Sequence, residues 1–216
     1  LAATEESTRD LHQFSVRADH RLTDSDQIFA RFSTFDAEDL QPFGTSALQE
    51  SLVPGFGRTL TTHTRNFVGS HTHVFGDSML NELRFGWMRV NGGQVGLKEG
   101  NPFASRVGLL GVTTDPRDAG FPQISTGGFY STMGDPTINT TRNNQNFELY
   151  DNFTIDRGAH RWKFGAFWYR LQLRPVQADN ARGSFSYTGQ FTRNAFADFL
   201  VCYPTTANSR IRSGDE

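Results

Sequence analysis

Two histidines separated by one residue are the first side chains of this sequence that could bind a metal ion. His71 and His73 lie in a run of β-forming residues, where alternate side chains share a face, so both imidazoles point the same way. Imidazole nitrogens are common ligands of divalent transition metals. However, neither His63 nor His20 stands at a spacing that completes a ligand set, and two histidines alone are a weak signal. We therefore expect solvated or lumen-facing histidines, no metal and no cofactor.

A second pattern with chemical potential surrounds Ser78. The sequence Gly-Asp-Ser-Met-Leu at 76–80 follows a β-like run and resembles the nucleophile block of GDSL-type esterases. That resemblance implies Ser78 as nucleophile, with Asp156 and His160 as candidate acid and base. These two are four residues apart instead of three, and no helices alternate with the strands as an α/β fold requires. A Gly-Asp-Ser triplet between strands is also ordinary turn chemistry, so a serine esterase is only the alternative to a non-catalytic protein.

Composition narrows the fold class and the partners. The 21 basic and 23 acidic residues are scattered and give a net charge of −2, so nucleic acid is not an expected partner. Cys202 is the single cysteine, so an internal disulfide is excluded. The sequence assigns no role to Cys202. No window approaches the roughly 18 apolar residues of a membrane-spanning helix. Only 36% of residues are hydrophobic but 20 are Phe, a mixture that suits strands with one apolar and one polar face.

Hydrophobic alternation with a period of two predicts an all-β protein. In Gln13–Asp19, for example, Phe14, Val16 and Ala18 stand opposite polar side chains. Short turn signals join such runs into hairpins, which gives an antiparallel up-and-down meander. About seven strands are expected, at Gln13–Asp19, Gln27–Phe35, Thr64–Phe75, Leu80–Val90, Asn144–Ile155, Arg161–Leu173 and Gly183–Phe191, followed by a short helix or apolar loop at Asn194–Tyr203.

The connections between these strands alternate between short and long. Residues 36–60 and 91–143 are expected to be long loops, because they are rich in turn-forming residues and show no sustained period. Outer-membrane barrels sort their connections in this way, with short periplasmic turns and long extracellular loops. An open sheet of about seven strands would leave edge amides unsatisfied in lipid. We therefore interpret residues 1–216 as one partial transmembrane β-barrel domain, part of a larger barrel in the bacterial outer membrane.

Four stretches of the chain carry a family resemblance, namely Gln13–Leu22 with Asp26–Phe32, Thr72–Gly86, Asp151–Gly165 and Gly183–Pro204. In this order they resemble the barrel of large TonB-dependent receptors that carry a carboxypeptidase-regulatory-like N-terminal module. The resemblance implies uptake of a small-molecule or oligomeric nutrient, of the metal-chelate or glycan class, through a barrel of about 22 strands. It implies no covalent catalysis, and it implies as partners TonB, a plug domain, the remaining barrel strands and outer-membrane lipid. No plug domain or TonB-box-like segment is recognisable here, so we expect an internal segment of such a receptor.

The long segment 91–143 is the expected recognition element. Lengthening a loop costs only about 0.6 kcal/mol per doubling, so a long loop can be retained for binding. Phe103, Phe121, Phe129 and Tyr130 provide apolar anchors for a ligand, whereas the alternative is a passive loop that shields the barrel mouth.

Two further groups of side chains are assigned to the faces of the sheet. One group is expected to form an aromatic belt at the membrane interface, and the alternative is that it forms the core of a soluble sandwich. Its members are Phe85, Trp87, Trp162, Trp168 and Tyr169. Cationic side chains on the polar face are expected either to line a pore that favours anions or only to solvate a lumen. They are Arg17, Arg31, Arg84, Arg161 and Lys163.

Overall fold

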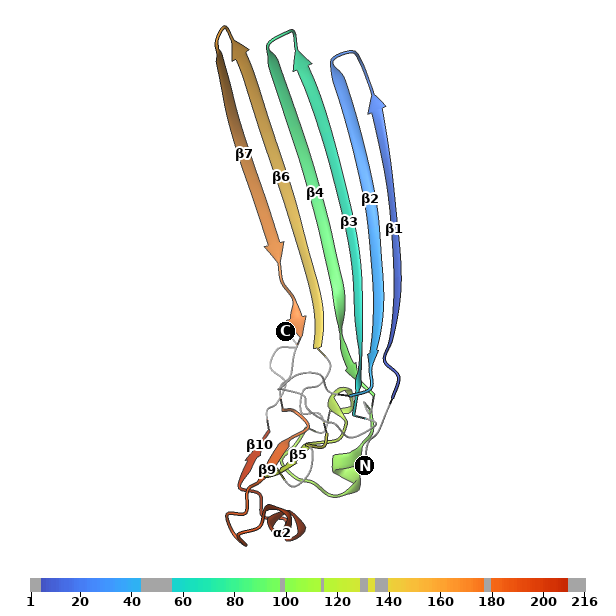
Figure 1. Cartoon of the computed structure of the whole chain (residues 1–216), viewed down its shortest axis with the longest axis vertical. Coiled ribbons are helices and arrows are strands. Elements are labelled where there is room, and N and C mark those ends of the chain that lie inside the picture. Colours follow the sequence, from blue (N-terminus) through green and yellow to red (C-terminus); the bar gives the residue numbers. More distant parts are fainter. Residues whose placement is uncertain are drawn as a thin grey trace.

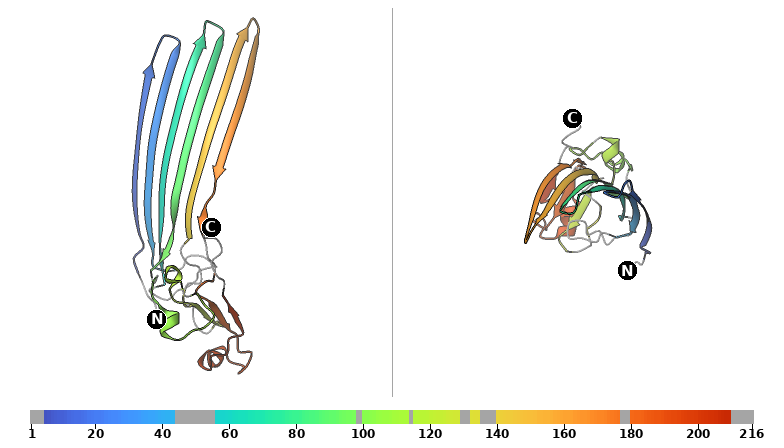
Figure 2. Two further views of the ribbon diagram at one scale, coloured as in Figure 1. Left: turned by 180° about the vertical axis from the view of Figure 1, so that it is seen from behind. Right: turned by 90° about the horizontal axis from the view of Figure 1, so that it is seen from above.

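Long antiparallel strands form most of the protein. The computed structural model describes residues 5–43, 56–97, 100–113, 115–128, 132–134, 140–176 and 180–209. The strands hydrogen-bond in the order β1-β2-β3-β4-β6-β7, an up-and-down meander, as the sequence predicts (Figure 1). The sheet is curved but does not close on itself (Figure 2). Its members are β1 (Thr8–Arg21), β2 (Asp26–Gln41), β3 (Arg58–Phe75), β4 (Met79–Gly96), β6 (Thr140–Arg157), β7 (His160–Gln172) and the short β8 (Pro175–Val176), which pairs with β6.

Tight turns close the hairpins at one end of the sheet, here named the turn end. Gly76 and Gly158 occupy two of these turns with φ of 60° and 62°, a region that glycine enters without a steric penalty. In the turn between β1 and β2, Thr23 Oγ1 donates to Asp26 Oδ2 at 2.6 Å and accepts from the backbone N–H of Ser25 at 3.2 Å. The long connections all lie at the opposite end, here named the loop end, so connection length is sorted by end as expected (Figure 1).

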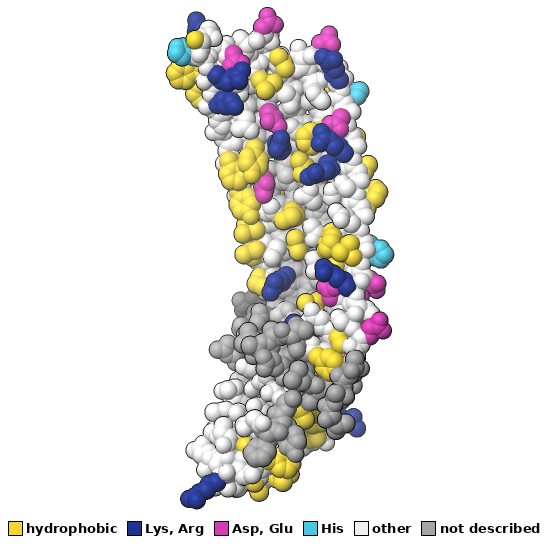
Figure 3. Space-filling model, viewed as in Figure 1, with side chains coloured by type: hydrophobic (Ala, Val, Ile, Leu, Met, Phe, Trp, Pro, Cys, Tyr) yellow, Lys and Arg dark blue, Asp and Glu magenta, His cyan; other side chains and the backbone are white. Residues whose placement is uncertain are grey.

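The sheet has one apolar face and one polar face. Residues paired across an antiparallel sheet point to the same side, so the pairs Phe67–Trp87 and Trp87–Phe147 continue one row on the apolar face. One position along, Asn66 pairs with Met88 on the polar face. Hydrophobic side chains are visible along the β7 side of the sheet (Figure 3). Aromatic residues that the apolar face leaves more than half exposed include Phe14, Trp162, Phe164 and Trp168.

A second, smaller sheet and short helices form a cap at the loop end. In this sheet β5 (Gln123–Thr126) pairs in parallel with β9 (Ser184–Tyr187), and β10 (Thr206–Asn208) pairs with the other edge of β9. The cap also holds α1 (Phe103–Arg106), the 3-10 turn η1 (Pro116–Asp118) and α2 (Ala195–Leu200). No helix among the described residues is long and apolar enough to cross a membrane. Most of the buried side chains lie in the cap, among them Asp118, Ala181, Arg182, Tyr187, Ala195 and Asp198.

The strands extend further toward the loop end than the hydrophobic pattern predicted. Strand β2 continues to Gln41 and β3 begins at Arg58, so the connection expected at 36–60 is shorter. Strand β4 continues to Gly96 and β6 begins at Thr140, which shortens the connection expected at 91–143 in the same way. At Gly93 a Cβ would stand 1.9 Å from the carbonyl oxygen of Thr140, so this glycine permits a close approach of two strands. Backbone hydrogen bonds continue where apolar alternation stops, and the pattern therefore marks only part of each strand.

The prediction of a barrel strand at Gly183–Phe191 is wrong. Only Ser184–Tyr187 is extended, and it belongs to the small sheet of the cap instead of the meander. Alternation reports that one face of a strand is buried, but not which sheet buries it. For Asn194–Tyr203 a short helix and an apolar loop were both expected, and the structure shows the helix, α2. There the Asn194 side chain accepts hydrogen bonds from the backbone N–H groups of Phe196 and Ala197.

Candidate functional site

The cap encloses a cavity of about 220 Å³ beside α1. Small-molecule sites are typically concave and mostly apolar, with a few polar groups that fix orientation. This cavity has that character, and its size suits a small ligand or one end of a larger one. Apolar lining comes from Pro102, Phe103, Leu109 and Val112, and polar lining comes from Asp115, Asp118 and Arg182.

Aromatic rings from both long connections meet at the edge of this cavity. The rings of Phe103 and Phe121 have centroids 4.2 Å apart, and Phe56 packs against Phe121 at 5.1 Å. Two of the four aromatic residues expected to contact a ligand are thus brought together, and Phe103 lines the cavity itself. The other two, Phe129 and Tyr130, lie outside the described residues. No pattern in the sequence connects Phe56 with them.

Arg182 supplies a buried cation to the same cavity. It follows β8 and is only 4% exposed, and its Nε donates to the backbone carbonyl of Asp118 at 3.2 Å. A Cβ on Gly120 would stand 2.4 Å from that Nε, so the glycine makes room for the guanidinium. A guanidinium keeps its charge at every physiological pH and presents a fork of donors. Arg182 was not predicted from the sequence, because an isolated arginine in a loop carries no pattern.

A separate cluster of ionisable side chains lies on the apolar face near the turn end. Asp26 Oδ1 is 2.9 Å from His71 Nε2 and 2.6 Å from His73 Nδ1. The strand register causes this, because Asp26 of β2 pairs directly with His73 of β3. The two histidines share a face as predicted, but it is the apolar face, so the expectation that they could face the lumen is wrong. Asp26 was missed because it stands 45 residues before His71, in a turn-like stretch.

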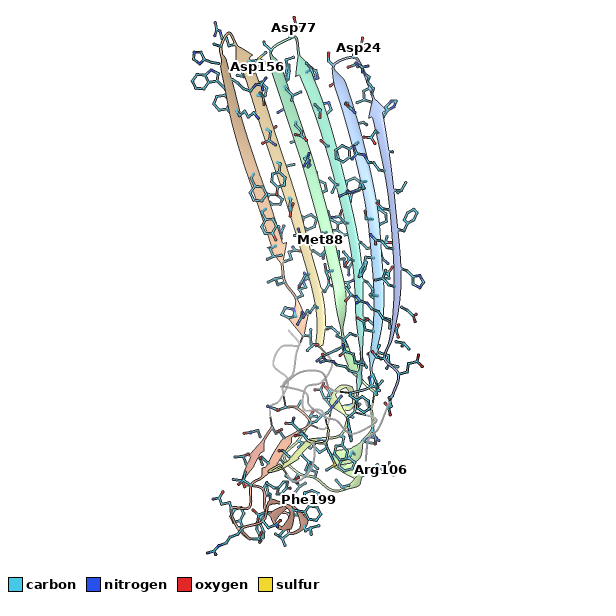
Figure 4. The ribbon with its side chains drawn as sticks, viewed as in Figure 1. Asp24, Asp77, Met88, Arg106, Asp156 and Phe199 are labelled. Carbon is cyan, nitrogen blue, oxygen red and sulfur yellow. The ribbon has the colours of Figure 1, made fainter. Side chains whose placement is uncertain are left out.

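The constellation required for a serine esterase is not assembled. Ser78 occupies an exposed turn between β3 and β4, and Asp156 lies at the tip of another hairpin (Figure 4). Asp156 pairs with Arg161 across that hairpin while His160 pairs with Arg157, so the carboxylate and the imidazole point to opposite faces of the sheet. Both carboxylate oxygens of Asp156 already accept hydrogen bonds from the guanidinium of Arg161.

The register also tests the side chains assigned to the two faces. The cations Arg17, Arg31, Arg84, Arg161 and Lys163 all occupy the polar face, as expected. Of the expected belt, Tyr169 is misplaced, because it pairs with Glu148 on the polar face. The other four members, Phe85, Trp87, Trp162 and Trp168, lie on the apolar face.

A meander with one apolar face, one polar face and connections sorted by end is the architecture of a bacterial outer-membrane β-barrel wall. Comparison with known families agrees. Residues 1–215 match the outer membrane beta barrel domain family, and the chain belongs to that family. It is therefore a protein of the bacterial outer membrane. No curated protein and no solved structure matches the chain.

Proposed function

We propose that this chain forms part of the wall and of the ligand-capturing cap of a TonB-dependent outer-membrane receptor that takes up a nutrient. The unclosed sheet supports the first half of the proposal. Among the described residues, β1 and β7 each have a partner on one side only. An unpaired strand edge in lipid leaves backbone groups unsatisfied, so further strands must complete the wall. Neither the wall nor the cap performs covalent chemistry in this function.

The single observation that carries the second half is the place of the cap. The cavity, with Phe103 and Arg182 in its lining, lies at the end of the sheet where all long connections gather. In outer-membrane barrels that end faces the outside of the cell. A nutrient arriving from outside therefore reaches the cap before it reaches the lumen formed by the polar face.

The lining of the cavity suits the nutrient classes proposed. The ring of Phe103 packs against the apolar surface of a ligand, and Phe121 holds that ring in place. Arg182, Asp115 and Asp118 supply charged hydrogen-bonding groups at the same cavity. A hydroxyl-rich glycan or an oxygen-rich metal chelate has many such groups to satisfy. Both nutrient classes then pass the polar face, and TonB supplies the energy for import.

The test uses the full-length receptor in living cells. Replacing Phe103 and Phe121 together by alanine should reduce nutrient uptake at limiting concentration by roughly tenfold or more, because apolar anchors dominate binding energy. Phe191→Ala is the matched control, since Phe191 is 56% exposed and packs against Tyr203 away from the cavity lining. Surface level is measured separately by labelling intact cells. Unchanged uptake in the double variant at normal surface level would remove the cap from the binding role.

A deletion provides a second test of the same role. Gly93 pairs directly with Thr141, so a deletion must begin after Gly96 and end before Thr140 to preserve the sheet. Replacing that interval by a short Gly-Ser linker should leave the receptor in the membrane and abolish uptake. Loss of uptake in cells without TonB separates active import from passive leakage. Uptake that persists without TonB would contradict the receptor proposal as a whole.

A further inference from the structure

We propose that Asp26, His71 and His73 form a binding site for a divalent transition-metal ion. The structure brings three possible ligand atoms of different residues together, namely Oδ1 of Asp26, Nε2 of His71 and Nδ1 of His73. All three atoms lie within 4.8 Å of one another. Two imidazoles and one carboxylate are a ligand set found in zinc sites that keep an open position.

The distances are close to those that a bound ion requires. Ligands that hold zinc at about 2.0–2.2 Å in a tetrahedron are separated from each other by roughly 3.4 Å. The oxygen–nitrogen separations here are 2.9 and 2.6 Å, slightly shorter because hydrogen bonds now occupy the place of the metal.

The carboxylate is held in place by its surroundings. Thr23 Oγ1 donates to Asp26 Oδ2 at 2.6 Å, so Oδ1 remains directed at the two imidazoles. The turn that carries Thr23 is tied to β3 by the backbone N–H of Val74, which donates to the Ser25 carbonyl at 2.9 Å. Outer partners of this kind orient metal ligands and add to affinity. The site is thus built before an ion arrives.

Access and chemistry also fit a metal ion. The side chains of His71 and His73 are 41% and 28% exposed, which leaves room for an ion with a water ligand. The ring of Phe75 packs on His73 at 4.2 Å and limits its motion. Because Asp26 belongs to β2 and the histidines to β3, a bound ion also joins two strands beside the turn end.

The protein contains its own comparison for this site. His63 Nδ1 lies 2.7 Å from Asp36 Oδ1, again between β3 and β2. There the same carboxylate oxygen accepts from Arg65 at 2.8 Å, so a permanent cation stands where the metal site has its second imidazole. An arginine repels a metal ion and cannot ligate it. His63→Ala therefore removes a similar histidine without touching the proposed site.

The experiment uses the full-length protein folded in detergent micelles, with Zn²⁺ as the probe. Calorimetric titration should show one ion per chain for the wild type and for His63→Ala. His71→Asn and His73→Asn keep a donor near Asp26 but lose the imidazole, and each should weaken binding by roughly 100-fold. Thr23→Ala should weaken binding by about 10-fold, because it frees the carboxylate without removing a ligand. Co²⁺ provides a second readout, since its visible absorption reports the geometry and the nitrogen ligands.

Three results would overturn the proposal. The first is that the wild type shows a β-sheet circular dichroism spectrum but does not bind Zn²⁺ stoichiometrically. The second is that His63→Ala weakens Zn²⁺ binding as much as the asparagine variants do. The third is that both asparagine variants bind Zn²⁺ as the wild type does. If a variant loses the β-sheet spectrum, heat denaturation of the wild type with and without Zn²⁺ tests the proposal instead. A site that joins β2 to β3 must raise the unfolding temperature when Zn²⁺ is added, and an unchanged temperature counts against it.

Discussion

The carboxylate of Asp151 accepts a hydrogen bond of 2.6 Å from Nδ2 of Asn81, which lies on the neighbouring strand. Asp151 pairs with Leu83 on one side and with Ala166 on the other, so it stands in a row of the apolar face. A charged side chain facing lipid destabilises a barrel, and a hydrogen-bond donor beside it reduces that cost. The hydrogen bond from Asn81 therefore lowers the cost of Asp151, the one acidic residue that interrupts the apolar alternation of β6.

Replacing Asn81 alone should destabilise the protein, whereas replacing Asn81 and Asp151 together should not. Asn81→Leu leaves the carboxylate without its side-chain donor and should lower the free energy of unfolding by about 1–3 kcal/mol. The double replacement by leucine restores an apolar row and should recover most of that loss. Urea unfolding in lipid vesicles measures both. Equal stability of the single and double variants would contradict this prediction.

The exposed apolar face predicts how the chain behaves in water. Phe14 and Phe164 are 58% exposed and Trp162 is 56% exposed, which a soluble monomer rarely tolerates over a continuous face. Without detergent or partner strands, the chain should associate or precipitate. Sedimentation velocity at rising concentration measures this directly. A compact monomer at high concentration would mean that another surface covers the apolar face.

Replacing Ser78 separates the outer-membrane function from the esterase alternative. Ser78 is an exposed turn residue, so Ser78→Ala should change stability by less than about 0.5 kcal/mol and leave any measured activity unchanged. Loss of a true nucleophile would lower turnover by orders of magnitude. Short-chain ester hydrolysis that disappears in this variant would restore the esterase.

The single cysteine offers a test of which end of the sheet faces outward. Cys202 is exposed and lies in the cap at the loop end. In intact cells a membrane-impermeant maleimide should label Cys202 of the full-length protein. A variant that combines C202S with D77C carries its only thiol of this segment at the turn end, where Asp77 marks a hairpin tip (Figure 4). That variant should react only after the outer membrane is opened, and the reverse pattern would invert the topology.

Asp198 predicts a pH dependence confined to the cap. Its buried carboxylate accepts hydrogen bonds from Thr192 Oγ1 at 2.7 Å, from the Thr192 backbone at 2.8 Å and from the Phe191 backbone at 3.2 Å. Burial opposes ionisation, but these hydrogen bonds outweigh it and hold the pKa of Asp198 below its usual value of 3.8. A lowered folded pKa means that the stabilisation is complete above the unfolded value and is lost as the pH falls through the folded one.

Hydrogen exchange of the α2 amides measures that dependence. Protection should be constant from neutral pH down to about pH 5 and should fall only in stronger acid. Asp198→Ala should lower protection of α2 at neutral pH, with the difference from the wild type shrinking in strong acid, while the amides of β3 and β4 stay protected. A loss of α2 protection between about pH 5 and 7 would assign the transition to another group.

Much of the wall could be predicted from the sequence because its determinants are local. Alternation in a segment such as Gln13–Asp19 fixes which side chains share a face, and turn residues such as Gly76 fix where a hairpin closes. These signals act over a few residues, so the meander and the sorting of connections by length could be predicted from the sequence. The polar ends of the strands were not, since the glycine-rich ladder around Gly93 has backbone pairing but no hydrophobic period.

Tertiary structure alone decided which distant residues meet. Nothing near Asp26 in the chain points to His71, and only the β2–β3 register places the carboxylate between two imidazoles. In the same way Phe56 and Arg182 reach the cavity of Phe103 through packing of the cap. The physical reason is that the period of a strand constrains neighbours along the chain, whereas contacts between elements depend on register and loop packing, which minimise the energy of the whole fold.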